Sequence, residues 1–413
     1  MAKHPRSAAS PRAIIAGGSL GGLLIANLLH RASWSVEILE RASGALDARG
    51  AGLVTHPELR EILWQAGVSP DAPLGVWVDR RTVLDGAGNR ILAMPLRQLF
   101  TGWSRIYHLL FAALPIERYH GGLGVVRFEQ DADRVRVFAS DGTVREAELL
   151  VAADGVRSTI RAQLAPEVQP EYAGYVAWRG LANETDFAPE THRSIFEDFA
   201  FSLPDHEQMI GYPVAGAHDD ITAGRRRYNF VWYRPSEEAT ELRRLLTDAS
   251  GKVHEGGIPP PLIRPEIIAE IRRIARERLS PQFAEVVERT REPFFQPIYD
   301  LYSKHLAFGR VAILGDAAFV ARPHCGMGVS KAGGDARALV DALIKNDNDV
   351  AAALRAYEAA RVPFGNAVVT HARHLGAFYQ AKRTTPEEHR AAERYRDPQA
   401  VIEDTALPFV IPP

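Results

Sequence analysis

The sequence lacks the features that mark several specialised classes of protein. Cys325 is its only cysteine, so an internal disulfide is impossible and no CxxC or Cys/His cluster can hold zinc or an iron–sulfur centre. Lys and Arg number 49 against 51 Asp and Glu, which excludes a strongly basic nucleic-acid binder. After the N-terminal segment no apolar run approaches the ~18 residues of a membrane span. We therefore expect a globular protein of the reducing cytoplasm, with neither nucleic acid nor membrane as a partner.

Glycines are concentrated near the start of the chain, in the stretch AIIAGGSLGGLLIANLLHRASWSVEILER (13–41). The pattern indicates a buried parallel strand, a glycine turn, a crossover helix and a second strand. Gly17 allows the tight turn, and Gly22 lets the helix pack close to the strand. Ser19 occupies the position where the middle glycine of the usual GxGxxG pattern is expected. The N–H groups and dipole at the start of the helix would then form a site for a pyrophosphate.

Glu40 ends the second strand at the distance from these glycines where a ribose-binding carboxylate is expected, ~20 residues on. A carboxylate there repels a ribose phosphate, so FAD or NAD is favoured over NADP as the tightly held nucleotide. Two other interpretations stay open at this point: a glycine-rich hairpin beside a surface Glu, and a secretory signal. Against the signal, glycines interrupt the apolar run and no small-residue cleavage site follows it.

The rest of the chain predicts an α/β protein with α+β elements, in which two domains are interleaved. After a glycine-rich loop at 48–52 come a short helix from Pro57, a hairpin in 78–96, an amphipathic helix in 103–114 and an antiparallel three-strand meander in 125–155. The stretch 172–234 is strand-rich and aromatic, 236–292 is charged and helical, and a buried strand returns at 309–318. The expected domains are a discontinuous nucleotide-binding domain (1–75, 97–171 and 290–380), an antiparallel-sheet domain (76–96 and 172–289) and a surface helix with a tail (381–413).

Two later stretches carry turns of the same kind as the first. LLVAADGVRSTIR (149–161) is an apolar strand ending in Asp154-Gly155, and GRVAILGDAAFVARPHCGMGVSKAGGDA (309–336) contains Gly315-Asp316 and Pro323 before its own glycines. With the N-terminal turn, they resemble the three motifs of the single-component FAD-dependent aromatic hydroxylases. The stretches YAGYVAWRG, NFVWY and ARPH look most like the hydroxypyridine monooxygenases, the 2,6-dihydroxypyridine 3-hydroxylases among them. The resemblance extends over nearly the whole chain, to about residue 380.

This resemblance implies a fold like that of p-hydroxybenzoate hydroxylase, with a Rossmann-like FAD-binding domain and a substrate domain. Asp316 would bond the ribityl chain, backbone N–H groups near Gly328 would face the flavin pyrimidine edge, and Arg105 would reach the pyrophosphate. Plainer roles stay open for each side chain: a solvated helix charge for Arg105, an Asx turn for Asp154 and a helix cap for Asp316. The FAD-binding residues implied are Gly17, Ser19, Leu20, Gly22, Glu40, Arg41, Arg105, Asp154, Asp316, Gly326, Gly328 and Val329.

The implied activity is that of an FAD-dependent monooxygenase. NADH or NADPH binds transiently and reduces FAD, and O2 then forms a flavin C4a-hydroperoxide that hydroxylates an activated ring, a hydroxypyridine or a phenol-like compound. No second glycine fingerprint or CxxC points to a disulfide reductase, and no WxWxI stretch points to a halogenase. An FAD oxidase or dehydrogenase without oxygen insertion, and a non-catalytic flavin-fold binding protein, are the alternatives.

Substrate contacts are expected from the aromatic sheet and from the loop after Asp316. The candidates are Arg179, Tyr212, Trp232 and His324. His324 is also the candidate catalytic base, because a histidine titrates near neutral pH, and His56 is its rival. We expect no metal site, and the resemblance implies a possible homodimer.

Overall fold

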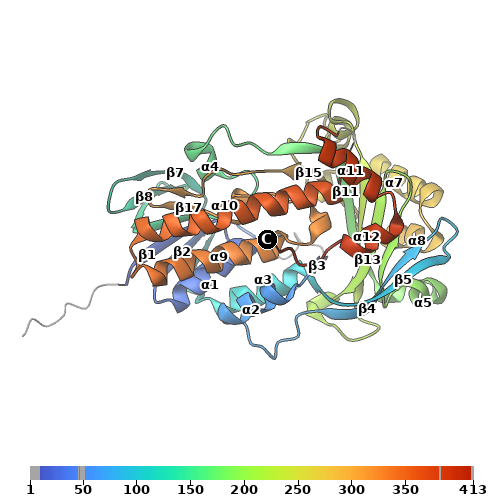
Figure 1. The fold of residues 1–413 in the computed structure, drawn as a ribbon, viewed down its shortest axis with the longest axis horizontal. Helices are drawn as coiled ribbons and strands as arrows, with labels where there is room; N and C mark the ends of the chain where they lie inside the picture. The colour runs from blue at the N-terminus through green and yellow to red at the C-terminus, as the bar shows by residue number, and fades with distance from the viewer. Residues whose placement is uncertain (1–9, 45, 47–51, 381–382, 411–413) are drawn as a thin grey trace, which may run out of the picture.

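The computed structural model describes residues 10–44, 46, 52–380 and 383–410, and Figure 1 shows two large sheets joined by long helices. Most of the glycine-rich loop expected at 48–52 lies outside the described residues. Within them, no helix has both the length and the apolar character needed to cross a membrane.

The first sheet, sheet A, has the strand order β16-β17-β10-β1-β2-β6 in the described residues. Apart from the short edge strand β16, neighbouring strands run parallel. The central strands β1 and β10 are buried on both faces, which is why they read as continuous apolar runs. The strands are β1 (Arg12–Ala16), β2 (Ser35–Glu40), β6 (Tyr119–Gly121), β10 (Leu149–Ala152), β16 (Ala307–Phe308) and β17 (Val311–Ile313).

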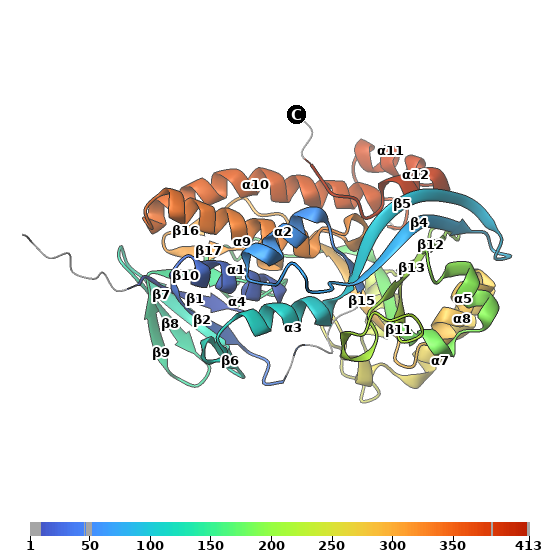
Figure 2. The same ribbon diagram turned by 90° about the horizontal axis from the view of Figure 1, so that it is seen from below.

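Helices cover one face of sheet A, and a small antiparallel sheet, β7-β8-β9, lies on the other side (Figure 2). The first helix, α1, connects β1 to β2 and packs against α9 and α3. Its Leu and Ala side chains are therefore buried. The elements of these layers are α1 (Leu20–Arg31), α2 (Pro57–Gln65), α3 (Trp103–Ala113), α4 (Thr159–Leu164), α9 (Gly328–Lys345), α10 (Val350–Leu375), β7 (Val125–Gln130), β8 (Val135–Ala139) and β9 (Val144–Ala147).

The second sheet, sheet B, has the order β15-β11-β14-β13-β12-β4-β5-β3 in the described residues. One face packs on α5, α7 and α8, and the other faces the end of α10, the helix α12 and the loop that precedes α9. The strands are β3 (Gly52–Val54), β4 (Val76–Leu84), β5 (Arg90–Gly102), β11 (Glu171–Asn183), β12 (Phe199–Ser202), β13 (Gln208–Val214), β14 (Arg227–Pro235) and β15 (Phe294–Asp300). The helices named are α5 (Pro189–Ile195), α7 (Pro265–Arg278), α8 (Pro281–Arg289) and α12 (Pro398–Asp404).

The structure differs from the sequence-based expectation in the meander and in the C-terminal stretch. The three-strand meander is present, but its predicted last strand divides at Glu148: β9 completes the meander, and β10 joins sheet A because both its faces are apolar. The C-terminal stretch forms α11 (Pro386–Arg394) and α12 instead of a surface helix with a tail. Val401 and Ile402 of α12 are buried against sheet B, so this stretch belongs to the core.

The division into two interleaved domains remains a prediction, and sheet membership shifts two of its boundaries. β15 was expected within the nucleotide-binding domain, yet it pairs with β11 in sheet B. β3 was also expected there, and it pairs with β5 in the same sheet. Both strands lie at an edge of sheet B, and the sequence of an edge strand does not show which sheet it joins.

Candidate active site

The three motifs meet at one edge of sheet A. β1, β10 and β17 are parallel neighbours, so the turns that follow them, at Gly17, Asp154 and Gly315, leave the sheet side by side. Backbone hydrogen bonds tie the turns together: the Ala153 N–H donates to the Ala16 carbonyl at 2.8 Å, and the Leu314 N–H donates to the Ala152 carbonyl at 3.0 Å. This is the edge of an open α/β sheet at which nucleotides bind.

The first turn has no room for side chains at two of its glycines. Gly17 has a φ of +99°, and a Cβ there would lie 2.4 Å from the Ala153 carbonyl oxygen. A Cβ on Gly22 would lie 1.9 Å from the Gly17 carbonyl oxygen, because α1 begins directly against the turn. Ser19 is the N-cap of α1, its side chain caps no N–H of the described chain, and Leu20 is the buried first residue of the helix. A small hydroxyl thus stands free at the helix start, as a phosphate site requires.

Glu40 is buried at the end of β2, and its carboxylate closes the first turn. Its Oε2 accepts from the Gly18 N–H at 2.7 Å, and its Oε1 accepts from the Ala42 N–H at 2.9 Å. Each carboxylate oxygen has a second lone pair, so these bonds leave capacity for a ribose hydroxyl. Arg41 follows it with an exposed side chain.

The second motif supplies a half-buried carboxylate at the same edge. Asp154 Oδ2 accepts from the Thr159 N–H at 2.7 Å, whereas Oδ1 is buried without a hydrogen-bond partner in the described chain. Burial raises the pKa of Asp154, although hydrogen bonds to Ser158 and nearby backbone N–H groups oppose the rise. Arg161 links the second and third motifs, since its Nη1 donates to the Ala317 carbonyl at 2.9 Å.

The third motif places an exposed carboxylate beside an open helix start. The Asp316 side chain is 58% exposed, immediately after the buried strand β17. Gly326 adopts a left-handed conformation with a φ of 65°, and it leads into α9, whose first residue is Gly328. A Cβ on Gly328 would meet no described atom within 4 Å, and Val329 beside it is partly exposed.

Arg105 has two partners that lie outside the three motif turns. Its Nε donates to the Pro73 carbonyl at 2.9 Å, and its Nη1 lies 3.7 Å from the Asp219 carboxylate. Neither contact involves a residue of the three motif turns. The predicted reach of Arg105 to a pyrophosphate therefore stays a prediction.

A polar group of side chains faces the site from sheet B. Tyr212, Asn229 and Leu181 are register partners on β13, β14 and β11, so their side chains leave the sheet on one side. Arg179, two residues from Leu181, points the same way. Asn229 Oδ1 accepts from the Gly52 N–H at 2.8 Å, and Arg179 Nη2 lies 3.5 Å from the Gly52 carbonyl oxygen.

Two donors in this group have no acceptor among the described residues. Asn229 Nδ2 and Arg179 Nε are both buried and unpartnered. The bond from Gly52 to Asn229 Oδ1 defines which atom of the amide is the nitrogen, so the free group is a donor. Buried donors without a partner are uncommon in proteins and mark places where a ligand can accept.

Trp232 does not line this site, which corrects the sequence-based assignment. Side chains alternate along β14, so Trp232, three residues after Asn229, points to the opposite face of sheet B. It is fully buried against the cluster of α7 and α8, and its Nε1 donates to Glu207 Oε2 at 2.9 Å. Tyr212 leaves the sheet on the same side as Asn229: it stacks on Phe100 with ring centroids 4.1 Å apart, and burial raises its pKa to about 12.

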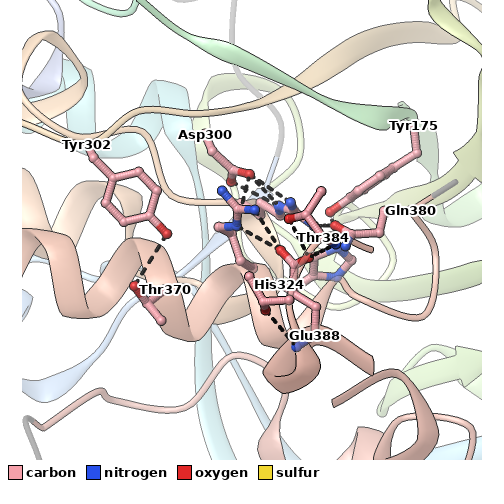
Figure 3. Close-up of polar contacts among 11 residues, drawn as sticks. Tyr175, Asp300, Tyr302, His324, Thr370, Gln380, Thr384 and Glu388 are labelled. Carbon is pink, nitrogen blue, oxygen red and sulfur yellow. Dashed lines mark hydrogen bonds and ion pairs between the residues drawn. The ribbon is translucent and has the colours of Figure 1, made fainter. Parts of the chain in front are cut away.

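His324, on the loop before α9, lies beside Tyr175 of sheet B (Figure 3), and both of its ring nitrogens have hydrogen-bond partners. Nδ1 lies 2.8 Å from Gln208 Oε1, an acceptor, so Nδ1 carries the proton. Nε2 lies 2.9 Å from the Tyr175 hydroxyl and accepts from it. The side chain is 1% exposed, and burial, with the charge of Arg322, holds its pKa well below 6.5. In this arrangement Nε2 has no lone pair left for a substrate proton.

Asp300, Gln380 and Glu388 lie near His324 (Figure 3), and they belong to a chain of charged and polar side chains that anchors its loop. Arg322 makes a bidentate pair with Asp300, with Nη2 2.7 Å from Oδ2, and donates to Gln380 Oε1 at 2.6 Å. Arg373 of α10 lies 3.8 Å from Asp300 and 2.6 Å from Glu388 of α11. The loop that faces the site is thus joined to the C-terminal helices by charge-assisted bonds.

His56, the rival base, is also buried. Its Nε2 lies 3.4 Å from the Ala406 carbonyl oxygen, its Nδ1 lies 3.3 Å from Ser330 Oγ, and burial lowers its pKa. Both contacts are long, so His56 is held less firmly than His324.

Comparison with known proteins shows which family the chain belongs to. A family profile described as FAD binding domain-like matches residues 172–300. The 2,6-dihydroxypyridine 3-monooxygenase of Paenarthrobacter nicotinovorans is 31% identical over 380 residues, which is 91% of this chain and 93% of that protein. The solved 2,6-dihydroxypyridine-3-hydroxylase from Arthrobacter nicotinovorans has a TM-score of 0.84 at 30% identity, covering 91% of this chain and 95% of that one.

The chain belongs to the FAD-dependent aromatic monooxygenases. It is therefore an FAD enzyme that hydroxylates an aromatic ring, as its three motifs predicted. The fold extends to a more distant protein, HpxO of Klebsiella pneumoniae, solved with FAD and uric acid. Its TM-score is 0.76 at 23% identity, covering 96% of this chain and 93% of that one.

The geometry of this aromatic monooxygenase fits an FAD. The Cβ-free turn at Gly17 and Gly22, the free Ser19 hydroxyl, the exposed Asp316 carboxylate and the open start of α9 stand along one sheet edge. Sequence reasoning missed Asn229, Gln208 and Tyr175, which the structure adds to the site. No local motif marks these residues, because their positions depend on which face of sheet B they leave.

Proposed function

We propose that this aromatic monooxygenase acts on a hydroxypyridine-type ring, with NADH or NADPH as the transient reductant. The similarity that carries the proposal is the 31% identity to a 2,6-dihydroxypyridine 3-monooxygenase across 91% of the chain. FAD, when bound, supplies the reduction of O2 and the transfer of one oxygen atom to the ring. The protein's own residues bind and orient the ring and keep water from the reaction.

For FAD, the backbone of the first turn and the Ser19 hydroxyl would hold the pyrophosphate, and Glu40 the ribose. Asp316 would accept from the ribityl hydroxyls. The start of α9, at Gly328 and Val329, would donate to the pyrimidine edge, where the helix dipole favours negative charge. Leu20, Arg41, Arg105, Asp154 and Gly326 complete the set that we propose around the cofactor.

For the substrate, the two unpartnered donors of sheet B are the central feature. Asn229 Nδ2 and Arg179 Nε would donate to an oxygen on the ring, and Tyr212 would form a wall beside it. Hydroxypyridines carry such oxygens as hydroxyl, oxo or oxyanion groups. An oxyanion suits Arg179 best, because a charged pair of donor and acceptor is stronger than a neutral one. An ionised ring is also richer in electrons and more easily hydroxylated.

For His324 we propose a positioning role in this arrangement. Its bonds to Gln208 and Tyr175 connect the loop before α9 to sheet B, so the two sides of the substrate site keep one spacing. The base role remains a prediction, and it requires the Tyr175 hydroxyl to leave Nε2 first.

The compartment and assembly state follow the family. A reducing cytoplasm agrees with Cys325, which is buried and unpaired. A homodimer is the assembly that we expect.

The decisive experiment combines a spectrum with a substrate screen. Purified protein should show flavin absorbance, and 2,6-dihydroxypyridine, 6-hydroxynicotinate and 3-hydroxybenzoate should be compared for stimulation of NADH and NADPH oxidation. We expect a hydroxypyridine to give the highest kcat/KM and a product heavier by one oxygen atom. Stimulation confined to the benzoate would overturn the substrate class. NADH oxidation that yields only peroxide with every ring would favour the oxidase alternative.

A further inference from the structure

A buried lysine stands directly behind the exposed carboxylate of the third motif. Lys331, in the first turn of α9, is 0% exposed, and its Nζ donates to the Gly315 carbonyl at 2.8 Å. The same Nζ lies 4.0 Å from Asp316 Oδ1. Its Nζ also lies 5.9 Å from the centre of the Phe319 ring. Lysine is rarely buried to this degree, so its position calls for a physical reason.

Both backbone polar groups of Gly315 form hydrogen bonds with charged side chains of α9. Lys331 donates to the Gly315 carbonyl, and Asp335 Oδ2 accepts from the Gly315 N–H at 3.1 Å. Asp335 is itself paired with Arg361 of α10, Nε to Oδ1, at 2.7 Å. Gly315 has a φ of 63°, so this turn is not one that the chain adopts by default. Lys331 and Asp335 stabilise this conformation, because each forms a hydrogen bond with one backbone polar group of Gly315.

The ammonium group of Lys331 has no acidic side chain at hydrogen-bonding distance in the described residues. Arg361 and Asp335 neutralise each other in a close pair, whereas the ammonium group of Lys331 has one neutral carbonyl at short range and the Asp316 carboxylate at 4.0 Å. A buried ammonium is costly unless it is paired, and Asp316 is the acidic side chain in ion-pair range of it. Burial, together with the charge of Asp335, raises the pKa of Asp316, and Lys331 opposes that rise, so its charge favours the ionised carboxylate.

We propose that Lys331 is a positioning residue for FAD binding, acting through the Gly315-Asp316 turn and not by contacting the substrate. Its hydrogen bond sets the direction of the turn, and its charge keeps Asp316 ionised as an acceptor for the polyol hydroxyls of the cofactor. The affinity for FAD then depends on a side chain that is itself inaccessible to solvent.

The test is FAD affinity of the full-length protein, measured without substrate by flavin fluorescence after the bound flavin has been removed and FAD added back. For Lys331→Met we expect the Kd for FAD to rise about tenfold, since a hydrogen bond to a charged donor is lost. For Asp316→Asn, at the exposed end of the pair, we expect a rise of similar size. The double variant should bind FAD no more weakly than the worse single one, because both act through one turn. Lys345→Met is the matched control, as it removes an exposed lysine from the same helix.

Two results would overturn the proposal. One is a Kd for Lys331→Met within twofold of wild type in a protein with unchanged thermal stability. The other is additive effects of the two substitutions, which would mean that Lys331 only supports the core. If Lys331→Met does not fold, Lys331→Gln, which keeps a donor but not the charge, should raise the Kd about threefold; an unchanged Kd in that variant would also reject the role. Because no substrate is added, the result does not depend on which ring the enzyme hydroxylates.

Discussion

The two sides of the active site are built in different ways. At the edge of sheet A the site consists mainly of backbone: turns without Cβ atoms, a helix start and a strand end, all at Gly17, Gly22, Gly315 and Gly328. On sheet B it consists of side chains whose direction depends on the register of the strands. A site made of backbone is disrupted by adding a side chain at one of a few glycines. A site made of side chains is disrupted by substitutions on one face of the sheet. This difference predicts which substitutions abolish cofactor binding and which impair only substrate binding.

The largest effect is expected at the glycine turn. Gly22→Ala places a Cβ within 1.9 Å of the Gly17 carbonyl oxygen, so α1 must move away from β1. We expect the purified variant to retain no FAD, as judged by its absorbance near 450 nm against that of wild type. Gly86→Ala is the control, because a Cβ there meets no described atom within 4 Å. Normal FAD content in Gly22→Ala would show that the turn is not the cofactor site.

A smaller, selective effect is expected on sheet B. Arg179→Met should lower kcat/KM about 10- to 100-fold through loss of a charged hydrogen bond, while the Kd for FAD changes by less than twofold. Steady-state kinetics with the best hydroxypyridine and a fluorescence titration measure the two quantities.

The opposite face of the same sheet supplies the control for that experiment. Trp232→Phe should lower the melting temperature by a few degrees, through loss of the bond to Glu207, yet leave kcat/KM within about twofold. A larger loss of kcat/KM in Trp232→Phe than in Arg179→Met would reverse our assignment of the two faces.

His324 offers a finer distinction between positioning and proton transfer. If it only joins the loop to sheet B, His324→Asn should lower kcat/KM about tenfold and keep the shape of the pH profile. Removal of a general base costs about 10²- to 10⁴-fold and abolishes one limb of the profile. Profiles of kcat/KM from pH 5.5 to 9 for wild type and variant decide between them.

The smallest effect is a pH dependence of stability. Because the pKa of folded His324 lies well below 6.5, the unfolded chain binds a proton that the folded chain does not as the pH falls below 6.5. Stability therefore decreases as the pH falls, by about 1 kcal/mol between pH 6.5 and 5.5. His324→Asn should lose this part of the decrease in melting temperature. Glu388 does not interfere, since its pKa is lowered to about 2 and it stays charged throughout; parallel curves for both proteins would contradict the assignment.

The sequence predicted which backbone turns come together, but it did not predict the direction of every side chain on sheet B. The glycines at 17 and 22, the turn at Asp154 and the turn at Gly315-Asp316 all lie at one edge, as the motifs indicated. The stretch NFVWY was correctly expected in the aromatic sheet, but Trp232 was assigned to the wrong face of it.

Some site residues were beyond sequence reasoning altogether. No sequence pattern singled out Lys331, because its burial arises from the packing of α9 on the turn after β17. The C-terminal helices looked solvent-exposed because α11 is rich in charge, yet its Glu388 pairs with Arg373 inside the structure.

The order of the amino acids determined where this chain must turn without side chains, because a missing Cβ is a property of a residue and needs no partner. From that came the nucleotide site, the cofactor and the family. The tertiary structure decided which side chains of sheet B share a face, since a shift of one residue in strand register sends every side chain to the other face. It also decided the protonation of the buried groups, because desolvation exists only once the surrounding chain has packed.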